Sequence, residues 1–349
     1  MPGKKKAKKL KPYEKIQVFI DKYTELCTEY DVEMLDQVDE LYGPIIIAKK
    51  GRKLPPMLQF SDEPINPKNL RPLVEAFQTG TIGISFFSFL NTESGDEGLH
   101  VLAHALTPPL EIQGIQYNSN KVTASGCRAI ARGFHESKSL CILELDFNPE
   151  IGDEGVIGLC HYGHCPTLTR LSLRFDNISD DGAEAIGAWL ALPECKLNEL
   201  LLNGNQIGPK GAIALAKHLP ENHSLRRLDL SDNVFGYDPE ALDALIEGIK
   251  GCETLTGVLL QNSFEVPEGY ADKFQQLVTD KPLGEFILSV KMDQMIFQNT
   301  RATAIANQKK IIKEQKAKAK AEKAAAKTQK DSPKEQPKEE EKPASTPPA

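Results

Sequence analysis

The chain has 349 residues, of which 40% are hydrophobic and 26% charged, and its formal net charge is −7. No apolar run approaches the roughly 20 residues that a membrane-spanning helix requires, and no apolar stretch follows the N-terminal lysines as it would in a secretory signal. The seven cysteines are an odd, scattered set, so we expect a reducing, intracellular setting rather than a disulfide scaffold.

Charge is distributed unevenly along the chain. Residues 1–11 hold six lysines and no acid, and residues 301–330 carry a net charge of +8. Residues 331–349 carry −2, which leaves −19 for residues 12–300. The sequence therefore predicts an acidic body between two basic arms.

The N-terminal part divides into an arm and a cap. Residues 1–11 are predicted to be a disordered basic arm. Residues 12–56 are predicted to form a helical cap of one or two helices, because apolar residues recur at helical spacing between residues 13 and 42. The clearest stripe consists of Ile16, Phe19, Ile20, Tyr23 and Leu26.

Seven short runs between residues 84 and 260 carry an apolar residue at positions 1, 4 and 6. Successive runs begin 28, 28, 28, 29, 28 and 30 residues apart, a period that indicates a solenoid built from one repeated unit. A degenerate copy containing Leu58 and Phe60 precedes them, so residues 57–270 are predicted to be one repeat domain. The seven runs begin at Ile84, Ile112, Leu140, Leu168, Leu197, Leu225 and Leu255.

Two further positions recur in these repeats. Position 9 is asparagine in four of the seven and position 15 is glycine in five, from Gly98 to Gly269. The asparagines are Asn120, Asn148, Asn205 and Asn233. This pattern resembles the leucine-rich repeat of the ribonuclease-inhibitor-like subtype. The resemblance implies an α/β solenoid, or horseshoe, with a parallel concave sheet and convex helices.

The physical properties of these residues predict the same repeat unit of strand, turn and helix. Apolar residues at positions 1, 4 and 6 face inward from a short strand, and the asparagine side chain satisfies backbone groups where the strand turns away. Polar residues before the glycine are of the types that cap a helix N-terminus and suit its dipole. These predicted caps are Asp96, Ser125, Asp153, Ser179 and Asp180.

The C-terminal part is predicted to close the array and then leave it. A helical pattern through Ile287, Met292 and Met295 predicts a capping or partner-binding helix within residues 271–307. If that helix folds back across the sheet, Met292, Met295 and Phe297 would cover it. Residues 308–349 are predicted to be a Lys/Ala-rich basic helix followed by a disordered tail.

Chemical motifs are scarce. Residues 160–165 place two cysteines and two histidines within six residues, but Cys165 stands at the same repeat position as Cys252 and Asn222, which indicates packing beneath the next strand. The chain shows no phosphate-binding loop, nucleophile elbow or recurrent catalytic histidine spacing. We therefore predict no metal, no cofactor and no enzymatic activity.

The best candidate site lies on the predicted concave face, where positions 3, 5, 7 and 8 point outward. Phe147 and Phe175 share position 8 in adjacent repeats, so they should stand side by side among charged neighbours. Exposed aromatic and arginine side chains are typical of protein interfaces. The predicted protein-binding residues are Phe147, Phe175, Arg170, Arg174, Glu144, Asp146, Ile142 and Leu201.

These features predict a non-enzymatic cytoplasmic scaffold or adaptor. Its concave face would bind a protein, and its basic arms would attach to an acidic polymer such as a microtubule, in a cytoskeletal or ciliary assembly. The alternative, implied by the resemblance to ribonuclease inhibitors and Ran GTPase-activating proteins, is regulation of an enzyme or small GTPase. Nucleic-acid binding and nuclear residence are disfavoured, because the lysine clusters lack interleaved aromatics and the acidic body repels phosphate.

Overall fold

A computed structural model describes residues 10–48, 55–80, 82–162, 165–261, 267–281 and 283–287. All of them belong to one compact unit, which spans residues 1–294. The lysine-rich arm up to residue 9 and everything after Ile287 lie outside the described residues. The predictions for Met292, Met295, Phe297 and residues 308–349 therefore fall outside them too.

Within the described residues, nine strands form one parallel sheet in chain order. Parallel neighbours cannot be joined by a tight turn, so each connection crosses the sheet and returns, here through a helix. The strands are β1 (Met57–Ser61), β2 (Phe86–Leu90), β3 (Gly114–Asn118), β4 (Ile142–Glu144), β5 (Arg170–Ser172), β6 (Glu199–Leu201), β7 (Arg227–Asp229), β8 (Gly257–Leu259) and β9 (Glu285–Ile287).

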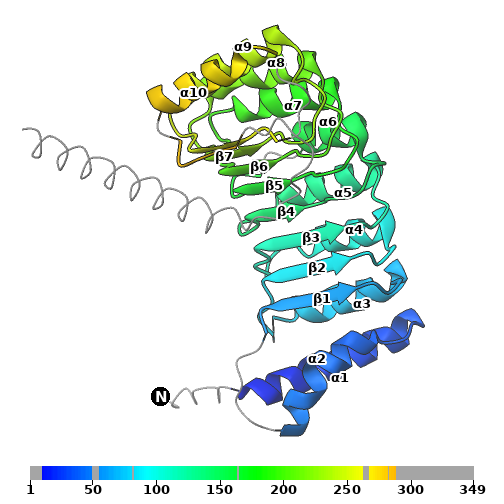
Figure 1. The fold of residues 1–349 in the computed structure, drawn as a ribbon. Helices are drawn as coiled ribbons and strands as arrows, with labels where there is room; N and C mark the ends of the chain where they lie inside the picture. The colour runs from blue at the N-terminus through cyan, green and yellow to red at the C-terminus, as the bar shows by residue number, and fades with distance from the viewer. Residues whose placement is uncertain are drawn as a thin grey trace, which may run out of the picture. The chain divides into compact units, whose positions relative to one another are not determined.

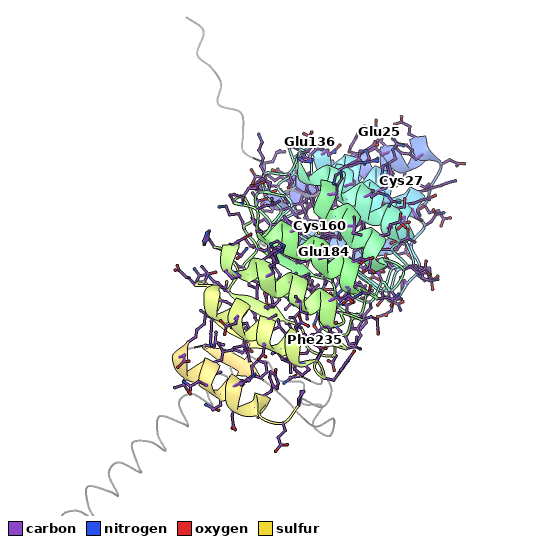
Figure 2. All side chains as sticks on the ribbon, turned by 90° about the horizontal axis from the view of Figure 1, so that it is seen from above. Glu25, Cys27, Glu136, Cys160, Glu184 and Phe235 are labelled. Carbon is purple, nitrogen blue, oxygen red and sulfur yellow. The ribbon has the colours of Figure 1, made fainter. Side chains whose placement is uncertain are left out.

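The helices that follow the strands cover one face of this sheet (Figure 1). They lie side by side in chain order when the molecule is viewed from above (Figure 2). This arrangement confirms the predicted α/β solenoid with a parallel sheet and an outer layer of helices. The helices are α1 (Pro12–Tyr30), α2 (Asp36–Ala48), α3 (Pro67–Gln78), α4 (Gly95–His104), α5 (Ala124–Phe134), α6 (Gly152–Tyr162), α7 (Asp180–Leu190), α8 (Pro209–His218), α9 (Pro239–Gly251) and α10 (Tyr270–Asp280), with a short 3₁₀ turn at Leu219–Glu221.

The core lies between the sheet and the helices. The inward positions of the third repeat, Leu140, Leu143 and Leu145, are completely buried, and the same positions are buried in the other repeats described. Because successive strands pair in register, each leucine packs against its counterpart one coil away. The apolar residues that recur along the sequence thus form one continuous core through the stacked coils.

A row of buried amide side chains, which we call the asparagine row, joins the coils where the strands end. Asn205 is typical of it. Its Oδ1 accepts hydrogen bonds from the N–H groups of Asp176 and Ile178, both at 3.0 Å. Its Nδ2 donates to the carbonyls of Leu173 and Leu202. The predicted role of these asparagines is confirmed. The row consists of Asn120, Asn148, Asp176, Asn205 and Asn233.

The predicted helix caps act on different partners from those expected. Asp153 does not cap its own helix α6. Its Oδ1 accepts hydrogen bonds from the N–H groups of Ser179, at 2.7 Å, and Gly182, at 3.0 Å, in the next coil. Asp96 and Asp180 act in the same way. The expected place of these aspartates in the first turns of α4, α6 and α7 is confirmed. Only the partner differs, because stacking places the start of one helix directly beside the loop of the next coil.

Two other predicted caps also fail. Ser179 precedes α7 but makes no side-chain cap hydrogen bond. In α5 the cap is Thr123, whose side chain accepts from the N–H of Ser125 at 3.1 Å, so Ser125 is capped rather than capping. The predicted turn was right and the capping residue was misplaced by two positions.

Helices α1 and α2 cap the first coil. The ring of Phe19 stacks on that of Phe77 in α3 at 4.5 Å between centroids, and the Tyr30 hydroxyl donates to the carboxylate of Glu75. At the other end, β9 pairs with β8 and extends the sheet. The helical pattern predicted through Ile287 is therefore wrong, because that residue belongs to a strand.

Candidate protein-binding site on the concave face

Phe147 and Phe175 follow β4 and β5 at the same repeat position. Their ring planes are 6° apart and their centroids 4.9 Å apart. That separation matches the spacing of about 4.8 Å between neighbouring strands, so the register alone produces a stacked pair. Phe147 is 49% exposed and Phe175 42%. The prediction that these side chains stand side by side at the surface is confirmed.

Both residues have the left-handed backbone, with φ of 61° at Phe147 and 57° at Phe175. The coil imposes this conformation, because the N–H of Phe147 donates to the carbonyl of Arg174 in the next coil at 2.8 Å, and that of Phe175 to Asn203 at 3.1 Å. In every repeat whose position 8 the structure describes, the residue at that position has a left-handed backbone conformation. Its other occupants are Asp62, Asn91, Ser119, Gly204 and Asp232.

Glycine, asparagine and aspartate tolerate this conformation, whereas a left-handed residue with a larger side chain costs about 1–2 kcal/mol. The mutual stacking of the rings offsets part of this strain, but Phe147 remains 49% exposed and Phe175 42% exposed. Folding alone therefore gives little reason for phenylalanine, rather than asparagine or aspartate, at positions 147 and 175. Strained backbone of this kind concentrates at functional sites.

Gly204 occupies position 8 of the next repeat and packs against the ring of Phe175. Its φ is +75°, and the ring of Phe175 lies directly against its Cα. A Cβ at this position would overlap the ring. Glycine is thus required both for the backbone conformation and for the ring of Phe175.

A chain of polar side chains, which we call the charge ladder, crosses the concave face from β2 to β9. Arg170 Nη1 donates to Glu199 at 2.9 Å, and Arg227 Nη1 donates to the other oxygen of Glu199 at 2.6 Å. Arg170 Nε lies 3.0 Å from Glu144 Oε1, an ion pair whose angles are not those of a hydrogen bond. The ladder consists of Ser88, Gln116, Glu144, Arg170, Glu199, Arg227 and Glu285.

Asp146 lies beside the ladder and is 0% exposed. Its carboxylate accepts hydrogen bonds from Ser172 Oγ at 2.6 Å and from Arg174 Nε at 2.8 Å and N at 3.0 Å. The guanidinium of Arg174 also pairs with it at 2.6 Å. Asp146 therefore holds Arg174 in place and presents no surface of its own.

The predicted patch is brought together only in part. Phe147, Phe175, Arg170, Arg174 and Ile142 keep exposed surface. The expected exposure of Asp146 and Leu201 is wrong: Asp146 is enclosed by its donors, and Leu201, between Ser172 and Asp229 in the register, is 3% exposed. Glu144 is almost buried and is engaged by Gln116 and Arg170.

Sequence reasoning missed five members of the ladder: Ser88, Gln116 and the three charged residues Glu199, Arg227 and Glu285. A signal for Glu199 and Arg227 existed, because position 3 reads Arg170, Glu199, Arg227 in successive repeats and opposite charges in register pair across parallel strands. Glu285 carried no such signal, since its strand was predicted to be helical.

Asp176 is the one carboxylic acid in the asparagine row. Its Oδ1 accepts the N–H of Asn148 at 2.7 Å, as an asparagine would. Among the described residues, its Oδ2 has no hydrogen-bond partner. Burial raises the pKa of Asp176 well above its usual value, and the nearby Asp146 acts in the same direction. The protonated form, which can donate like an amide, is thus favoured next to Phe175.

Two cysteines of the cluster at residues 160–165, Cys160 and Cys165, are buried. Cys165 Sγ lies 3.5 Å from Thr167 Oγ1 and Cys252 Sγ lies 3.7 Å from Thr254 Oγ1, and both cysteines are buried, so the two occupy the same packing position. Burial raises the pKa of the Cys160 thiol to about 12, which disfavours the thiolate that a metal needs. Across the described ranges, no group of three or more His, Cys, Asp or Glu side chains is placed to hold a metal ion.

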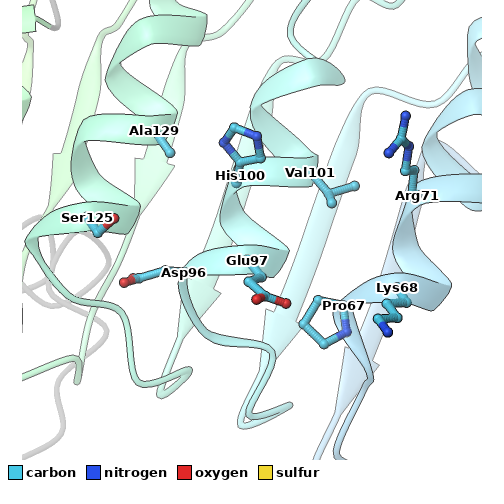
Figure 3. Close-up of a pocket in the computed structure, with 9 residues that line it drawn as sticks. All are labelled: Pro67, Lys68, Arg71, Asp96, Glu97, His100, Val101, Ser125 and Ala129. Carbon is cyan, nitrogen blue, oxygen red and sulfur yellow. The ribbon is translucent and has the colours of Figure 1, made fainter.

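In the part of the chain that the structure describes, no helix is both long and apolar enough to span a bilayer. A shallow groove of about 390 Å³ opens between α3, α4 and α5 on the helical side (Figure 3). Two of its charged side chains are engaged elsewhere, since Arg71 pairs with Glu75 and Asp96 accepts hydrogen bonds from Thr123 of the next coil. The groove therefore offers a weaker candidate site than the phenylalanine pair.

Comparison with known proteins agrees with this architecture. The Leucine Rich repeat family matches residues 136–160, 164–187, 195–216 and 221–238. The ribonuclease inhibitor of Mus musculus is 30% identical over 164 residues, which cover 47% of this chain and 29% of the inhibitor. The ribonuclease inhibitor of Sus scrofa is 29% identical over 167 residues, covering 47% of this chain and 36% of that protein.

A further relative is NACHT, LRR and PYD domains-containing protein 5 of Homo sapiens, 26% identical over 203 residues that cover 49% of this chain and 17% of that protein. The chain thus spans only about a third or less of the length of these relatives. The stacked coils and the matching repeats define a leucine-rich repeat protein. Its repeats are of the ribonuclease-inhibitor-like type.

Proposed function

We propose that this protein is a non-enzymatic interaction scaffold that binds a protein partner through the phenylalanine pair, Phe147 and Phe175. The observation that carries the proposal is that both rings are exposed on a backbone that disfavours them. Stacked rings form a rigid apolar platform that loses little side-chain entropy on binding. Such anchors supply most of the binding energy at protein interfaces.

The charge ladder supports the platform rather than replacing it. Arg170 lies between Glu144 and Glu199, and Arg227 lies between Glu199 and Glu285. The charges of both arginines are therefore largely balanced before any partner binds. Balanced charges contribute more to specificity and orientation than to affinity. Ile142 and the partly exposed Arg174 complete the contact surface next to the rings.

The proposal is tested by cross-linking and affinity capture from the native cell extract. The variant carries Phe147→Ala and Phe175→Ala, and the matched control carries Ile157→Ala, an exposed apolar residue on α6. We expect partners of the wild-type chain to be lost from the double variant and kept by the control. Retention of every partner by the double variant would move recognition away from the concave face.

A second candidate is inhibition of an enzyme, because the ribonuclease inhibitors are relatives of these repeats. An inhibition assay with pancreatic-type ribonuclease tests it directly. Inhibition that disappears with the double phenylalanine variant would unite the two proposals. A small-GTPase hydrolysis assay tests the related idea of a GTPase regulator.

Attachment of the basic arms to an acidic polymer also remains a proposal. It is motivated by the net charge of +8 in residues 301–330, next to a body of −19. Co-sedimentation with microtubules, with a chain truncated after Thr300 as the control, tests it. Loss of pelleting on truncation supports a cytoplasmic, cytoskeletal or ciliary role, and unchanged pelleting contradicts it.

A further inference from the structure

The edge of the sheet at which the strands begin carries a row of hydroxyl side chains. Thr167 Oγ1 donates to the carbonyl of Leu140 in the preceding coil at 2.7 Å. Ser139 and Thr254 stand at the same repeat position, directly before position 1, and also donate to carbonyls of the preceding coil. These bonds satisfy backbone acceptors, so the row has a structural role.

Two neighbouring repeats break this row. Lys196 holds the position in the repeat that begins at Leu197, and Ser224 holds it in the next repeat. The hydroxyl oxygen of Ser224 is buried and makes no hydrogen bond to any residue that the structure describes. A buried hydroxyl is normally hydrogen-bonded, so one without a partner in the protein indicates that something else binds it.

Position 2 of the repeats shows the same break. Thr169 Oγ1 and Thr256 Oγ1 each donate to a carbonyl of the preceding coil at 3.1 Å. The two repeats between them carry Asn198 and Arg226 instead, whose side chains have no hydrogen bond or ion pair within the described part of the chain. Four polar side chains in two adjacent repeats are thus free of the bonds that their counterparts make.

These four side chains line one cavity of about 550 Å³, which is larger than the groove of Figure 3. It opens where β5, β6 and β7 begin, three strands that lie side by side in Figure 1. Stacking of the coils brings the side chains together, because the N–H of Arg226 donates to the carbonyl of Asn198 at 2.8 Å. The apolar residues Leu192 and Pro193 form part of the wall.

The charged residues of the cavity are mainly cationic. Lys196 and Arg226 are exposed, and neither has an ion pair among the described residues. Glu221 is the one acid in the lining, and it lies 3.5 Å from His218. Neither cation belongs to the last turn of a helix, where basic side chains commonly balance the helix dipole. This local positive charge, in a body whose residues 12–300 carry −19, attracts anions.

We propose that this cavity binds a small organic phosphate. The guanidinium of Arg226 offers paired donors that match phosphate oxygens, and the ammonium of Lys196 adds a second charge. The hydroxyl of Ser224 and the amide of Asn198 complete the donor set. A phosphate group has three acceptor oxygens and a carboxylate has two, so phosphate satisfies more of these donors. The volume falls in the range of about 300–1,000 Å³ typical of small-molecule sites, and the apolar wall would contact the organic part.

The test is calorimetric titration of the full chain with inorganic pyrophosphate at physiological ionic strength. We expect saturable binding, and Lys196→Gln/Arg226→Gln should lower the affinity at least about tenfold because two charged donors are lost. Lys210→Gln/Arg132→Gln removes one lysine and one arginine at exposed sites on α8 and α5 and should leave the affinity unchanged. Circular dichroism confirms that the variants are folded.

Ser224→Ala distinguishes a binding site from general attraction between charges. The change alters no charge, and the hydroxyl has no partner to lose among the described residues, so thermal stability should stay the same or rise. Affinity for pyrophosphate should nevertheless fall about tenfold, because a hydrogen bond to a charged group is lost. Lower stability with unchanged affinity would make the serine purely structural and overturn the assigned donor set.

The remaining outcomes separate the possible ligands. Absence of saturable binding at millimolar pyrophosphate overturns the proposal, and so does an equal loss of affinity in the Lys210→Gln/Arg132→Gln control. Citrate that binds as tightly as pyrophosphate would assign the cavity to carboxylates, and a phosphoserine peptide that binds more tightly would assign it to a phosphorylated protein segment; either result overturns the proposal. The Phe147→Ala/Phe175→Ala variant should bind pyrophosphate like the wild-type chain, so this proposal and that for the concave face can fail separately.

Discussion

The guanidinium of Arg227 on β7 reaches the carboxylate of Glu285 on β9 across the whole width of β8, with 3.1 Å between Nε and Oε2. The strand between them carries Gly257 in register with both residues. The absence of a side chain at this position lets the charge ladder bypass a strand. The ladder therefore ties β9 to the array through a contact that skips one coil.

Replacing Gly257 with a larger residue should break this contact. In Gly257→Leu the side chain would separate Arg227 from Glu285 and leave a poorly exposed carboxylate without its donor, which costs about 1–3 kcal/mol. Gly257→Ala should be tolerated, because its Cβ would lie 3.4 Å from the Glu285 carboxylate. Urea unfolding of both variants checks the prediction, and equal stability of the leucine and alanine variants would contradict it.

Asp176→Asn should stabilise the protein. The amide would satisfy the position where Oδ2 lacks a partner among the described residues, a gain of about 1–3 kcal/mol. Because the folded-state pKa is raised, aspartate at this position is well tolerated below its unfolded pKa, and its contribution is lost as pH rises toward the folded pKa. The gain from asparagine should therefore be small near about pH 4 and grow toward about pH 7.

Urea unfolding of Asp176→Asn and the wild type across that pH range measures this gain. Asn148→Asp, which puts a second carboxylic acid in the same row, is the reverse control and should destabilise most at high pH. A gain for Asp176→Asn that stayed constant with pH would show that aspartate is ionised in the folded protein throughout.

Gly204 and Phe175 should show strong energetic coupling. Gly204→Ala adds a Cβ that overlaps the ring of Phe175 and strains a left-handed residue, so we expect a loss of about 1–3 kcal/mol. In a Phe175→Ala background only the backbone strain remains, so the same change should cost less. A double-mutant cycle measured by chemical denaturation isolates the ring contact. Additive effects would mean that the ring moves away freely.

Removing the rings should increase stability while abolishing recognition. Phe147→Asn and Phe175→Asn together place residues that accept the left-handed conformation at both strained sites, which relieves about 1–2 kcal/mol at each and gives up one stacking contact of about 1 kcal/mol, so the double variant should gain about 1 kcal/mol or more. Thermal unfolding measures the gain, and affinity capture measures the loss of partner. A variant that became less stable would show that the stacked pair contributes to the fold itself.

The periodicity of the sequence was enough to predict the coil and the adjacency of the rings. In a parallel array with a period near 28 residues, equal repeat positions become neighbours, so Phe147 and Phe175 had to meet. The burial of Asp146 was not predictable in this way. It depends on Arg174 folding back onto the previous strand, which is a matter of side-chain conformation and not of period.

The errors at the helix starts and at β9 have different physical causes. Asp153 has the right chemistry for a cap, and one sequence pattern is compatible with capping its own helix or the neighbouring loop. The stretch Glu285–Ile287 is too short to show an alternating pattern, so the helical spacing of residues beyond it decided the prediction.

The aspartates at the helix starts and the asparagines at the strand ends bond in opposite directions along the array. Asp153 serves the coil that follows it, whereas Asn205 serves the coil that precedes it. The coils that begin at Ile112, Leu168 and Leu197 thus depend on both neighbours for backbone hydrogen bonds, and losing either neighbour leaves N–H groups without acceptors. Unfolding should accordingly be a cooperative event that spreads through many coils at once, instead of fraying gradually from one end.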